Sequence, residues 1–310
     1  MKKIIIATLT ALLAILGTNN LALAETIYTS MPDQNDDYYQ PFYDSLKKFN
    51  YGFSREMNKG DSFSVLKFYY PDIWLRDVAP VVTTKMVKFK YSPDYLKKRD
   101  SRYLNNRFKK FLKGRYKYSQ SSLVLDGGNV QWDGDQTVVL TKKVFQDNPD
   151  WTRAEITSEL KDKLKVRRVV YILTEPGDVL GHSDGMVKFI SPNKMFINDF
   201  SYEPGFLQKI ERQIRKQIPE MKFIVLPSAY TSKGQYDSKI ASAKGLYINM
   251  LETDHTIYFP MYGLKQDHSV LKMVQAQTNK PVVPVKVGNI SVLGGSLHCL
   301  TWNVPNKFKD

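Results

Sequence analysis

The chain has 310 residues, a formal net charge of +14 at pH 7 and a single cysteine, Cys299. With one thiol the chain cannot form an intramolecular disulfide, so its fold depends on a hydrophobic core, which a chain of this length can build. No recognisable nucleic-acid-binding motif accompanies the positive charge, and we expect no nucleic-acid partner.

The first 24 residues have the pattern of a secretory signal peptide. Two lysines follow Met1, the stretch 4–16 is almost entirely apolar, and small residues precede a cleavage site after Ala24. An uncleaved membrane anchor is the alternative, but the apolar run is short for a bilayer and no later segment could cross one. The sequence therefore predicts an exported bacterial protein, periplasmic or secreted, with an N-terminal arm over 25–60 and a single domain over 61–310.

A basic stretch between Lys85 and Lys117 holds much of the positive charge. Apolar side chains recur within it at near-helical spacing and Lys or Arg residues fall between them, which predicts an amphipathic helix with a solvated basic face. The apolar positions are Leu96, Leu104, Phe108, Phe111 and Leu112. The same face also suits an anionic partner, such as an envelope surface of lipid or polysaccharide, or an acidic protein. Both interpretations stay open.

Beyond a short helix near 42–49, strands and helices alternate. We expect strands at 62–70, 81–91 and 122–125, on either side of the basic helix, and then a strand–helix–strand unit that repeats. In the first unit the strands are 137–141 and 168–173, and the helix between them opens with a capping box at Thr152 to Glu155. In the second unit the strands are 195–199 and 222–226 and the helix is 205–217. In the third unit the strands are 256–260 and 281–287 and the helix is 266–278. Such repetition predicts supersecondary units that are stacked or arranged radially.

Five polar motifs recur along the chain at intervals of about 50 to 70 residues, close to the interval of the repeated units. They are Trp74-Leu75-Arg76-Asp77, Asp126-Gly127-Gly128-Asn129, Gly181-His182-Ser183-Asp184-Gly185, Tyr247-Ile248-Asn249 and His298-Cys299. Each alone could be a turn, a structural histidine, a local ion pair or an inert cysteine. If each unit brings one motif to a common centre, a nucleophile, a histidine and two or three carboxylates meet in one cleft.

The first three motifs, together with Gly294-Gly295-Ser296-Leu297-His298-Cys299-Leu300-Thr301, resemble the agmatine deiminase family, which also includes the bacterial peptidylarginine deiminases. The resemblance covers residues 70 to 305, approximately. It implies the pentein fold, an α/β five-bladed propeller of ββαβ units around a central catalytic cleft. It also implies hydrolysis of a guanidino group to a ureido group and ammonia, with no metal and no cofactor.

The resemblance assigns a role to seven residues. It makes Cys299 the nucleophile, His182 the general acid and base, Asp77 and Asp184 the ligands of the guanidinium, and Trp74, Asp126 and Asn249 substrate-binding positions. These residue types suit the chemistry, because two carboxylates can pair with a planar guanidinium and a thiolate is a strong nucleophile near neutral pH. The carbon attacked belongs to a cation stabilised by resonance, so fixing its position matters.

The sequence leaves the substrate open between a small guanidine such as agmatine and arginine in a peptide. Many agmatine deiminases have Glu-Gly-Gly where this chain has Asp126, whose side chain is one methylene shorter. Bacterial peptidylarginine deiminases carry an Asn-Arg-Pro-Arg segment, which holds a terminal carboxylate, where this chain has Ser92-Pro93-Asp94-Tyr95. Two other functions also stay open: a guanidino amidinotransferase, and a catalytically silent pentein that binds a partner in the envelope. The oligomeric state is left open as well.

Overall fold

The structure, a computed structural model, describes residues 25–66, 70–229 and 235–310. The expected signal peptide, residues 1–24, lies outside the described residues and remains a prediction. No helix within the described ranges has the length and apolar character that a membrane crossing requires.

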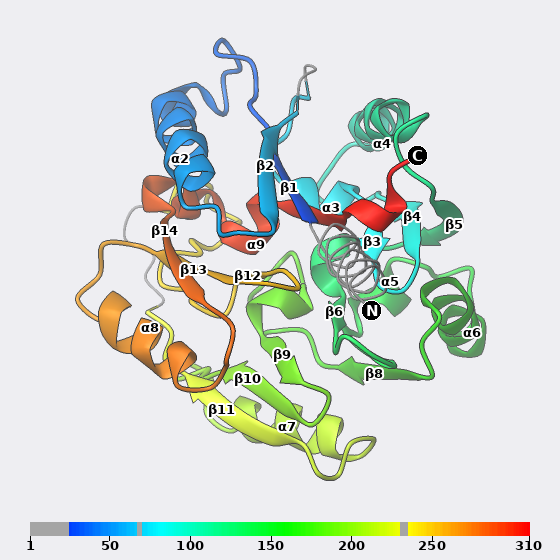
Figure 1. Ribbon diagram of the computed structural model, residues 1–310. Helices are drawn as coiled ribbons and strands as arrows, with labels where there is room; N and C mark the ends of the chain where they lie inside the picture. The colour runs from blue at the N-terminus through cyan, green and yellow to red at the C-terminus, as the bar shows by residue number, and fades with distance from the viewer. Residues whose placement is uncertain (1–24, 67–69, 230–234) are drawn as a thin grey trace, which may run out of the picture.

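The described chain forms five three-stranded sheets, which follow one another around a common centre in Figure 1. In each sheet the middle strand pairs antiparallel with one neighbour and parallel with the other. A parallel pair needs a crossover connection, and in every sheet a helix supplies it. The observed unit is therefore the ββαβ repeat that the family resemblance implies, and the chain is of the α/β class.

Four of the sheets are each built from consecutive segments. They are β3 (Val81–Val82), β4 (Met86–Lys90), α4 (Lys98–Leu112) and β5 (Ser119–Val124); β6 (Gln131–Trp132), β7 (Thr137–Thr141), α5 (Lys143–Gln146), α6 (Arg153–Leu164) and β8 (Arg168–Ile172); β9 (Val187–Ser191), β10 (Lys194–Asn198), α7 (Phe206–Arg215) and β11 (Lys222–Leu226); and β12 (Leu251–Glu252), β13 (Ile257–Met261), α8 (Asp267–Gln275) and β14 (Val282–Lys286). The three repeated units expected from the sequence are confirmed as the last three of these sheets. The capping box is also confirmed, since the Thr152 hydroxyl accepts the Glu155 N–H at 3.2 Å and Glu155 accepts the Thr152 N–H at 2.7 Å.

The fifth sheet joins the two ends of the described chain. Its middle strand β1 (Glu25–Thr29) pairs antiparallel with β15 (Trp302–Pro305) and parallel with β2 (Asp61–Val65). The crossover is α2 (Tyr43–Arg55), preceded by the short η1 (Gln40–Phe42). Residues 25–60, which we expected to be an arm outside the domain, are therefore part of one sheet of the repeat, and this sheet closes the ring.

The stretch 81–91, expected to be one strand, is a hairpin of β3 and β4. The backbone N–H of Thr83 donates to the carbonyl of Lys85 at 2.7 Å, and the N–H of Lys85 donates to the Thr83 hydroxyl at 3.3 Å. The hydroxyl also donates to the carbonyl of Leu164 at 2.8 Å, which fixes the turn to the end of α6. A tight turn made by a β-branched residue gives no sequence signal of a break, because threonine is common within strands. The strand expected at 62–70 ends at Val65 in the described part of the chain.

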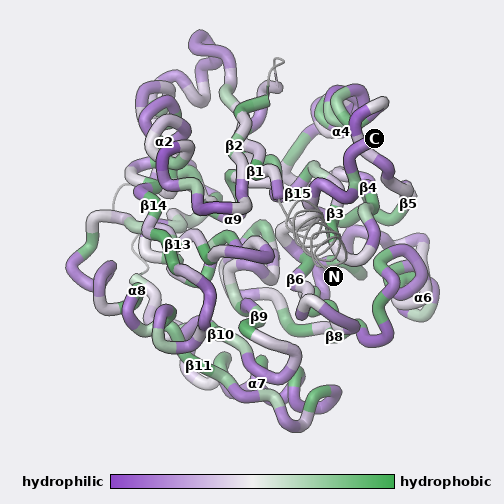
Figure 2. The backbone as a smooth tube through the Cα atoms, in the orientation of Figure 1, coloured by the Kyte–Doolittle hydropathy of each residue, from purple (hydrophilic) through white to green (hydrophobic). Residues whose placement is uncertain are grey.

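Apolar side chains fill the spaces between sheets and their helices. Figure 2 shows α4 and α6 alternating between hydrophobic and hydrophilic segments, as expected of helices with one buried face. Phe108 of α4 packs edge-on against Trp302 of β15, with ring centroids 5.6 Å apart. Leu104, Phe111 and Leu112 of the predicted apolar face lie in the same cluster, and Leu96 is partly buried against it. The predicted amphipathic basic helix is thus confirmed.

Candidate active site

The five polar motifs lie at equivalent places in the fold, each immediately before the first strand of a sheet. They occupy α3 (Leu75–Val78) before β3, η2 (Gly127–Asn129) before β6, η3 (Ser183–Gly185) before β9, residues 247–249 before β12, and α9 (Leu297–Leu300) before β15. Because the five sheets surround one centre, the five short turns meet there. Cys299 therefore lies in a helical turn that leads into β15.

His182 lies between two carboxylates, from α3 and from the start of η2. Its Nε2 is 3.1 Å from Oδ2 of Asp126, and its Nδ1 is 3.6 Å from Oδ1 of Asp77. Burial alone would lower the pKa of His182, but the charge of Asp77 and the hydrogen bond and charge of Asp126 together raise it to about 10. The imidazole is therefore protonated at neutral pH. The shorter side chain of Asp126 reaches the histidine without difficulty.

Gly128 keeps open the space between three of the site's side chains. A Cβ atom at this position would lie 2.6 Å from Oδ1 of Asp77, 2.8 Å from Nδ1 of His182 and 3.2 Å from Oδ2 of Asp184. The Gly128 N–H donates to Oδ1 of Asp77 at 3.1 Å. Burial raises the pKa of Asp77 to about 7, with Asp126 and Asp184 acting in the same direction and His182 opposing them. Asp77 is thus the carboxylate of the site that protonates near neutral pH.

Cys299 faces Asp184 and is held by Asn249. Its Sγ donates to Oδ2 of Asp184 at 3.6 Å. Burial, with the charges of Asp184 and Asp77, raises the pKa of the thiol well above its ordinary value. The side-chain oxygen of Asn249 accepts the backbone N–H groups of His298 at 3.1 Å and Cys299 at 3.4 Å. Asn249 therefore fixes the turn that carries the thiol.

His298 belongs to one of the five motifs, but the sequence reasoning gave it no role of its own. Its Nδ1 lies 2.7 Å from Oδ2 of Asp184. Burial and the nearby charge of Arg76 lower the pKa of His298 to about 3, so the ring is neutral. A carboxylate can only accept, so Nδ1 carries the proton and donates to Asp184. Burial would raise the pKa of Asp184, but this hydrogen bond together with the nearby charges of His182 and Arg76 outweighs burial, and the pKa is lowered. The available signal was a polar side chain within the apolar stretch 297–300.

Arg76 also belongs to a motif and was given no role in the site. A local ion pair with Asp77 was one open interpretation, but the guanidinium donates to the side-chain oxygen of Asn303 at 2.8 Å and to the carbonyl of His298 at 3.4 Å. Burial lowers the pKa of Arg76 to about 10, although Asp184, Cys299 and Asp77 oppose the shift. Arg76 therefore stays charged at neutral pH and offsets part of the negative charge of the site.

A pocket of about 230 Å³ lies over this cluster. Four of the seven predicted residues, His182, Asp184, Asn249 and Cys299, line it. The rest of its wall comes from residues 175–178, Leu180, Gly185, Tyr202, the loop around 241–246, and Gly294 and Gly295. It includes two acidic residues, Glu175 and Asp178, and none of the described residues that line it is Lys or Arg.

Comparison with known proteins identifies the family. Residues 25–305 match the model of the Porphyromonas-type peptidyl-arginine deiminase family. The chain belongs to this family. A relative from Enterococcus faecalis that carries an agmatine deiminase assignment is 27% identical over 219 residues, which are 61% of this chain and 60% of the relative. The chain thus spans about 60% of the length of that curated relative.

Solved structures identify the fold of this family member. The agmatine deiminase of C. jejuni superposes with a TM-score of 0.74 at 18% identity, over 92% of this chain and 94% of that one. DDAH from Pseudomonas aeruginosa superposes with a TM-score of 0.56 at 10% identity, over 91% and 100%. The pentein fold expected from the sequence is confirmed by these neighbours.

Three predicted residues of this deiminase-family chain lie outside the pocket wall. Asp77 and Asp126 do not line the pocket but lie 3.6 Å and 3.1 Å from the ring nitrogens of His182, which does. Trp74 packs on the backbone of Gly295, where a Cβ atom would be 2.3 Å from its ring. Its position explains why glycine is needed there, and the structure gives Trp74 a packing contact rather than a place in the pocket.

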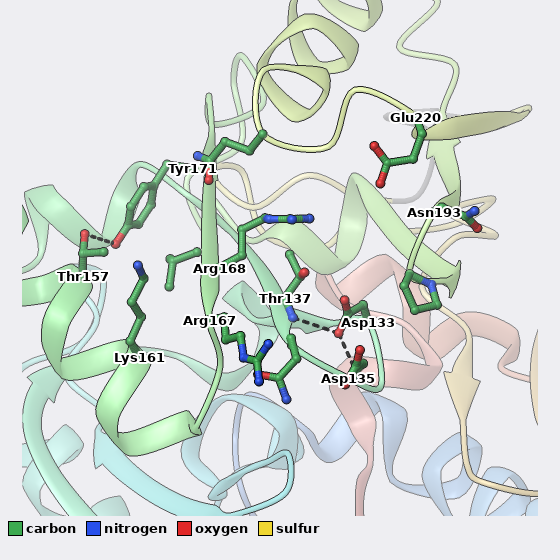
Figure 3. A pocket seen from close by; sticks show the side chains of 14 residues that line it. Asp133, Asp135, Thr137, Thr157, Lys161, Arg167, Arg168, Tyr171, Asn193 and Glu220 are labelled. Atoms are coloured by element: carbon green, nitrogen blue, oxygen red, sulfur yellow. Dashed lines mark hydrogen bonds between the residues drawn. The ribbon is translucent and has the colours of Figure 1, made fainter.

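A larger pocket, of about 950 Å³, lies away from the five motifs, between the sheets of β7 and β10 (Figure 3). Its polar groups serve the fold: Asp133 accepts the backbone N–H groups of Asp135 at 2.8 Å and Thr137 at 2.9 Å, and the Thr157 and Tyr171 hydroxyls are 2.9 Å apart. We therefore assign the candidate active site to the smaller pocket. Within the described residues, no group of three or more His, Cys, Asp or Glu side chains is arranged as a metal site.

Proposed function

We propose that this chain is a guanidino-group hydrolase that converts a guanidinium to a ureido group and ammonia through a covalent intermediate on Cys299. The observation that carries this proposal is the grouping of one thiol, one protonated imidazole and the carboxylates of Asp77 and Asp184 around one small space beside the pocket. Family membership supports it.

Asp77 and Asp184 form the binding site for the guanidinium. They approach the space beside Gly128 from two sides, and a side chain at residue 128 would fill that space. A planar cation with several N–H donors matches two buried carboxylates, because each can accept bidentate hydrogen bonds. His298, which donates to Asp184, fixes one of these carboxylates in place.

Substrate binding would activate the thiol. In the empty site, Asp184 and Asp77 raise the pKa of Cys299, so the thiol keeps its proton. A guanidinium bound between these carboxylates offsets their charge, which lowers the thiol pKa and releases its proton to solvent. The thiolate then forms a bond to the guanidinium carbon, and protonated His182 gives its proton to the nitrogen that departs as ammonia. Neutral His182 next takes one proton from water, whose oxygen bonds to the same carbon as the carbon–sulfur bond breaks. The second proton of that water passes to the departing sulfur, which restores the thiol.

We propose agmatine, or a similar small guanidine whose tail is not anionic, as the preferred substrate. The tail of a bound guanidine leaves the pocket past Glu175 and Asp178, and the described residues of the wall include no basic side chain that could hold a carboxylate. Asp178 is fixed by the backbone N–H groups of Leu180 and Gly181, both at 2.9 Å. Arginine within a peptide is the second candidate, supported by the family model.

We also propose that the protein is exported and cleaved after Ala24, on the evidence of its first 24 residues. Glu25 is the first residue of β1, so this cleavage would leave the closing sheet intact. Cell fractionation and N-terminal sequencing of the processed protein test the proposal, with Glu25 as the expected first residue. A cytoplasmic protein that keeps Met1 would contradict it.

Ammonia release from a panel of agmatine, arginine and arginyl peptides tests the proposed hydrolysis, with the folded Cys299→Ser variant as the control. We expect release that is lost in the variant, because a serine hydroxyl is a far weaker nucleophile at neutral pH. Transfer of the amidino group to an added amine would indicate an amidinotransferase instead. Binding of guanidines without either reaction would indicate a silent pentein.

A further inference from the structure

The positive charge of the chain is concentrated on one helix and its flanks. Residues 97–117 contain ten Lys or Arg residues and one Asp, a net +9 out of the +14 of the whole chain. We call the exposed basic side chains of this segment the α4 face. The exposed members are Lys97, Lys98, Arg99, Arg102, Lys109, Lys110, Lys113, Arg115 and Lys117.

Most of this charge has no partner among the described residues. Arg99 pairs with Asp100 at 3.3 Å, but the two side chains are 86% and 45% exposed. No ion pair with a described residue involves Lys97, Lys98, Arg102, Lys109, Lys110 or Lys113. Some of these charges also oppose one another, because Lys98 and Arg102, like Lys109 and Lys113, are like charges four residues apart and repel each other.

The orientation of the α4 face is fixed by the opposite side of the helix. Leu104, Phe108 and Phe111 are buried in the cluster around Trp302, so the helix cannot rotate to hide its charges. The basic side chains follow a helix of 15 residues, which is about 22 Å long. Figure 1 shows α4 at the periphery of the ring, beside the C-terminus. The result is a fixed, convex basic surface, apart from the pocket that the proposed hydrolysis uses.

We propose that the α4 face binds the surface of an anionic lipid bilayer. A convex face a single helix wide matches a flat layer of headgroups better than a strand of polymer, which is bound in a groove. Tyr103, which is 47% exposed, lies among the cations, and tyrosine is favoured where one end of a side chain is apolar and the other is wet. Lysine and arginine can also lay their apolar stems against such a surface while their charges reach the phosphates. The contact would hold the protein at the bilayer without crossing it.

Co-sedimentation of the full chain with vesicles tests the proposal. One set of vesicles is phosphatidylcholine alone, and the other contains 40% phosphatidylglycerol. The test variant is Lys98→Gln, Arg102→Gln, Lys109→Gln and Lys113→Gln. The matched variant is Lys209→Gln, Arg212→Gln, Lys216→Gln and Lys222→Gln, which removes the same charge from exposed positions on and after α7. Circular dichroism melting shows that both variants fold, and 0.5 M NaCl is added in a parallel series.

We expect the unmodified chain to bind phosphatidylglycerol vesicles and to be released by salt, since attraction to an anionic surface is screened. The affinity of the test variant for these vesicles should fall by at least about 100-fold, because each basic group near such a surface contributes about fivefold to the affinity. The matched variant should bind within about threefold of the unmodified chain. Equal weakening in both variants would overturn the proposal, because net charge alone would then explain binding. The proposal would also be overturned if the unmodified chain bound phosphatidylcholine vesicles as tightly as phosphatidylglycerol vesicles. Tight binding to heparin without binding to vesicles would overturn it as well.

Discussion

Asp126 and His182 are joined across two neighbouring sheets: Oδ2 of Asp126, before β6, lies 3.1 Å from Nε2 of His182, before β9. Both side chains are buried. The carboxylate therefore orients the ring and also favours its protonated form, which is the form that can give a proton to departing ammonia.

Replacing Asp126 with Asn should shift the alkaline limb of the activity profile. The pKa of His182 is raised to about 10, so the protonated ring is favoured below that pH and lost as pH rises through it. Asn keeps the shape of the side chain but removes a negative charge, so the limb of kcat/KM should move to lower pH and kcat should fall by about 10-fold or more. Asp135→Asn, at an exposed position in the next turn, is the control. An alkaline limb that stays in place would show that Asp126 does not set the protonation of His182.

The acid limb should come from Asp77. Its folded-state pKa of about 7 lies above the ordinary value, so the carboxyl group is neutral at lower pH and charged above it. Only the charged form can pair with a guanidinium, so kcat/KM for agmatine should rise by about tenfold per pH unit below pH 7 and level off above it. Asp77 and His182 interact strongly, so the two limbs belong to the pair. A measured profile that is flat from pH 5.5 to 7 would contradict this assignment.

Much of the fold was accessible from the sequence because the repeat is local. Each of the last three sheets carries its own strand, helix and strand in order, with apolar runs that can be recognised without knowledge of the rest. Strand β1 gave no such signal: its five residues become a middle strand only by pairing with β2 and with β15, at the opposite end of the chain. A polar, turn-rich stretch of this kind looks like an arm until those long-range partners are known.

The site shows the same division between local and long-range information. The motifs predicted which residues meet, since Cys299, His182, Asp77 and Asp184 all lie at the centre. The hydrogen bond of His298 to Asp184 joins residues 114 positions apart and could not be derived from spacing. The acidic wall at Glu175 and Asp178 was missed because it belongs to a loop outside the motifs.

Gly128→Ala tests whether the space beside Asp77 receives the substrate. The added methyl group would lie 2.6 Å from Oδ1 of Asp77 and 2.8 Å from Nδ1 of His182, closer than real Cβ atoms approach. We expect kcat/KM to fall by about 100-fold or more, because a misplacement of about 1 Å can cost this much. Gly52→Ala in α2 is the matched control, since no atom lies within 4 Å of its Cβ. Near-normal activity of a folded Gly128→Ala protein would place the guanidinium elsewhere.

His298 is expected to act as a positioning residue through Asp184. His298→Ala removes the 2.7 Å hydrogen bond, so Asp184 loses its orientation and KM for agmatine should rise by about 10-fold or more. His298→Asn can present an amide N–H near the place of Nδ1 and should recover part of the loss. A structural role alone would lower the melting temperature of both variants and leave KM unchanged.

The charge of the substrate's tail should decide selectivity. In the described part of the chain, the pocket wall carries Glu175 and Asp178 and no basic side chain, and the stretch 92–95 supplies no arginine to hold a carboxylate. We expect kcat/KM to be highest for agmatine, and a C-terminal arginyl peptide and its amidated twin to lie within about tenfold of each other, or about 1.4 kcal/mol.

Asp178→Asn removes one negative charge at the wall and should lower kcat/KM for agmatine by about three- to tenfold more than that for the peptide with the free carboxylate. Asp178→Glu, which keeps the charge, is the control for altered loop packing. A hundredfold preference for the free carboxylate would show that a cation holds it after all, and Arg99, at the start of α4, would be the first residue to replace.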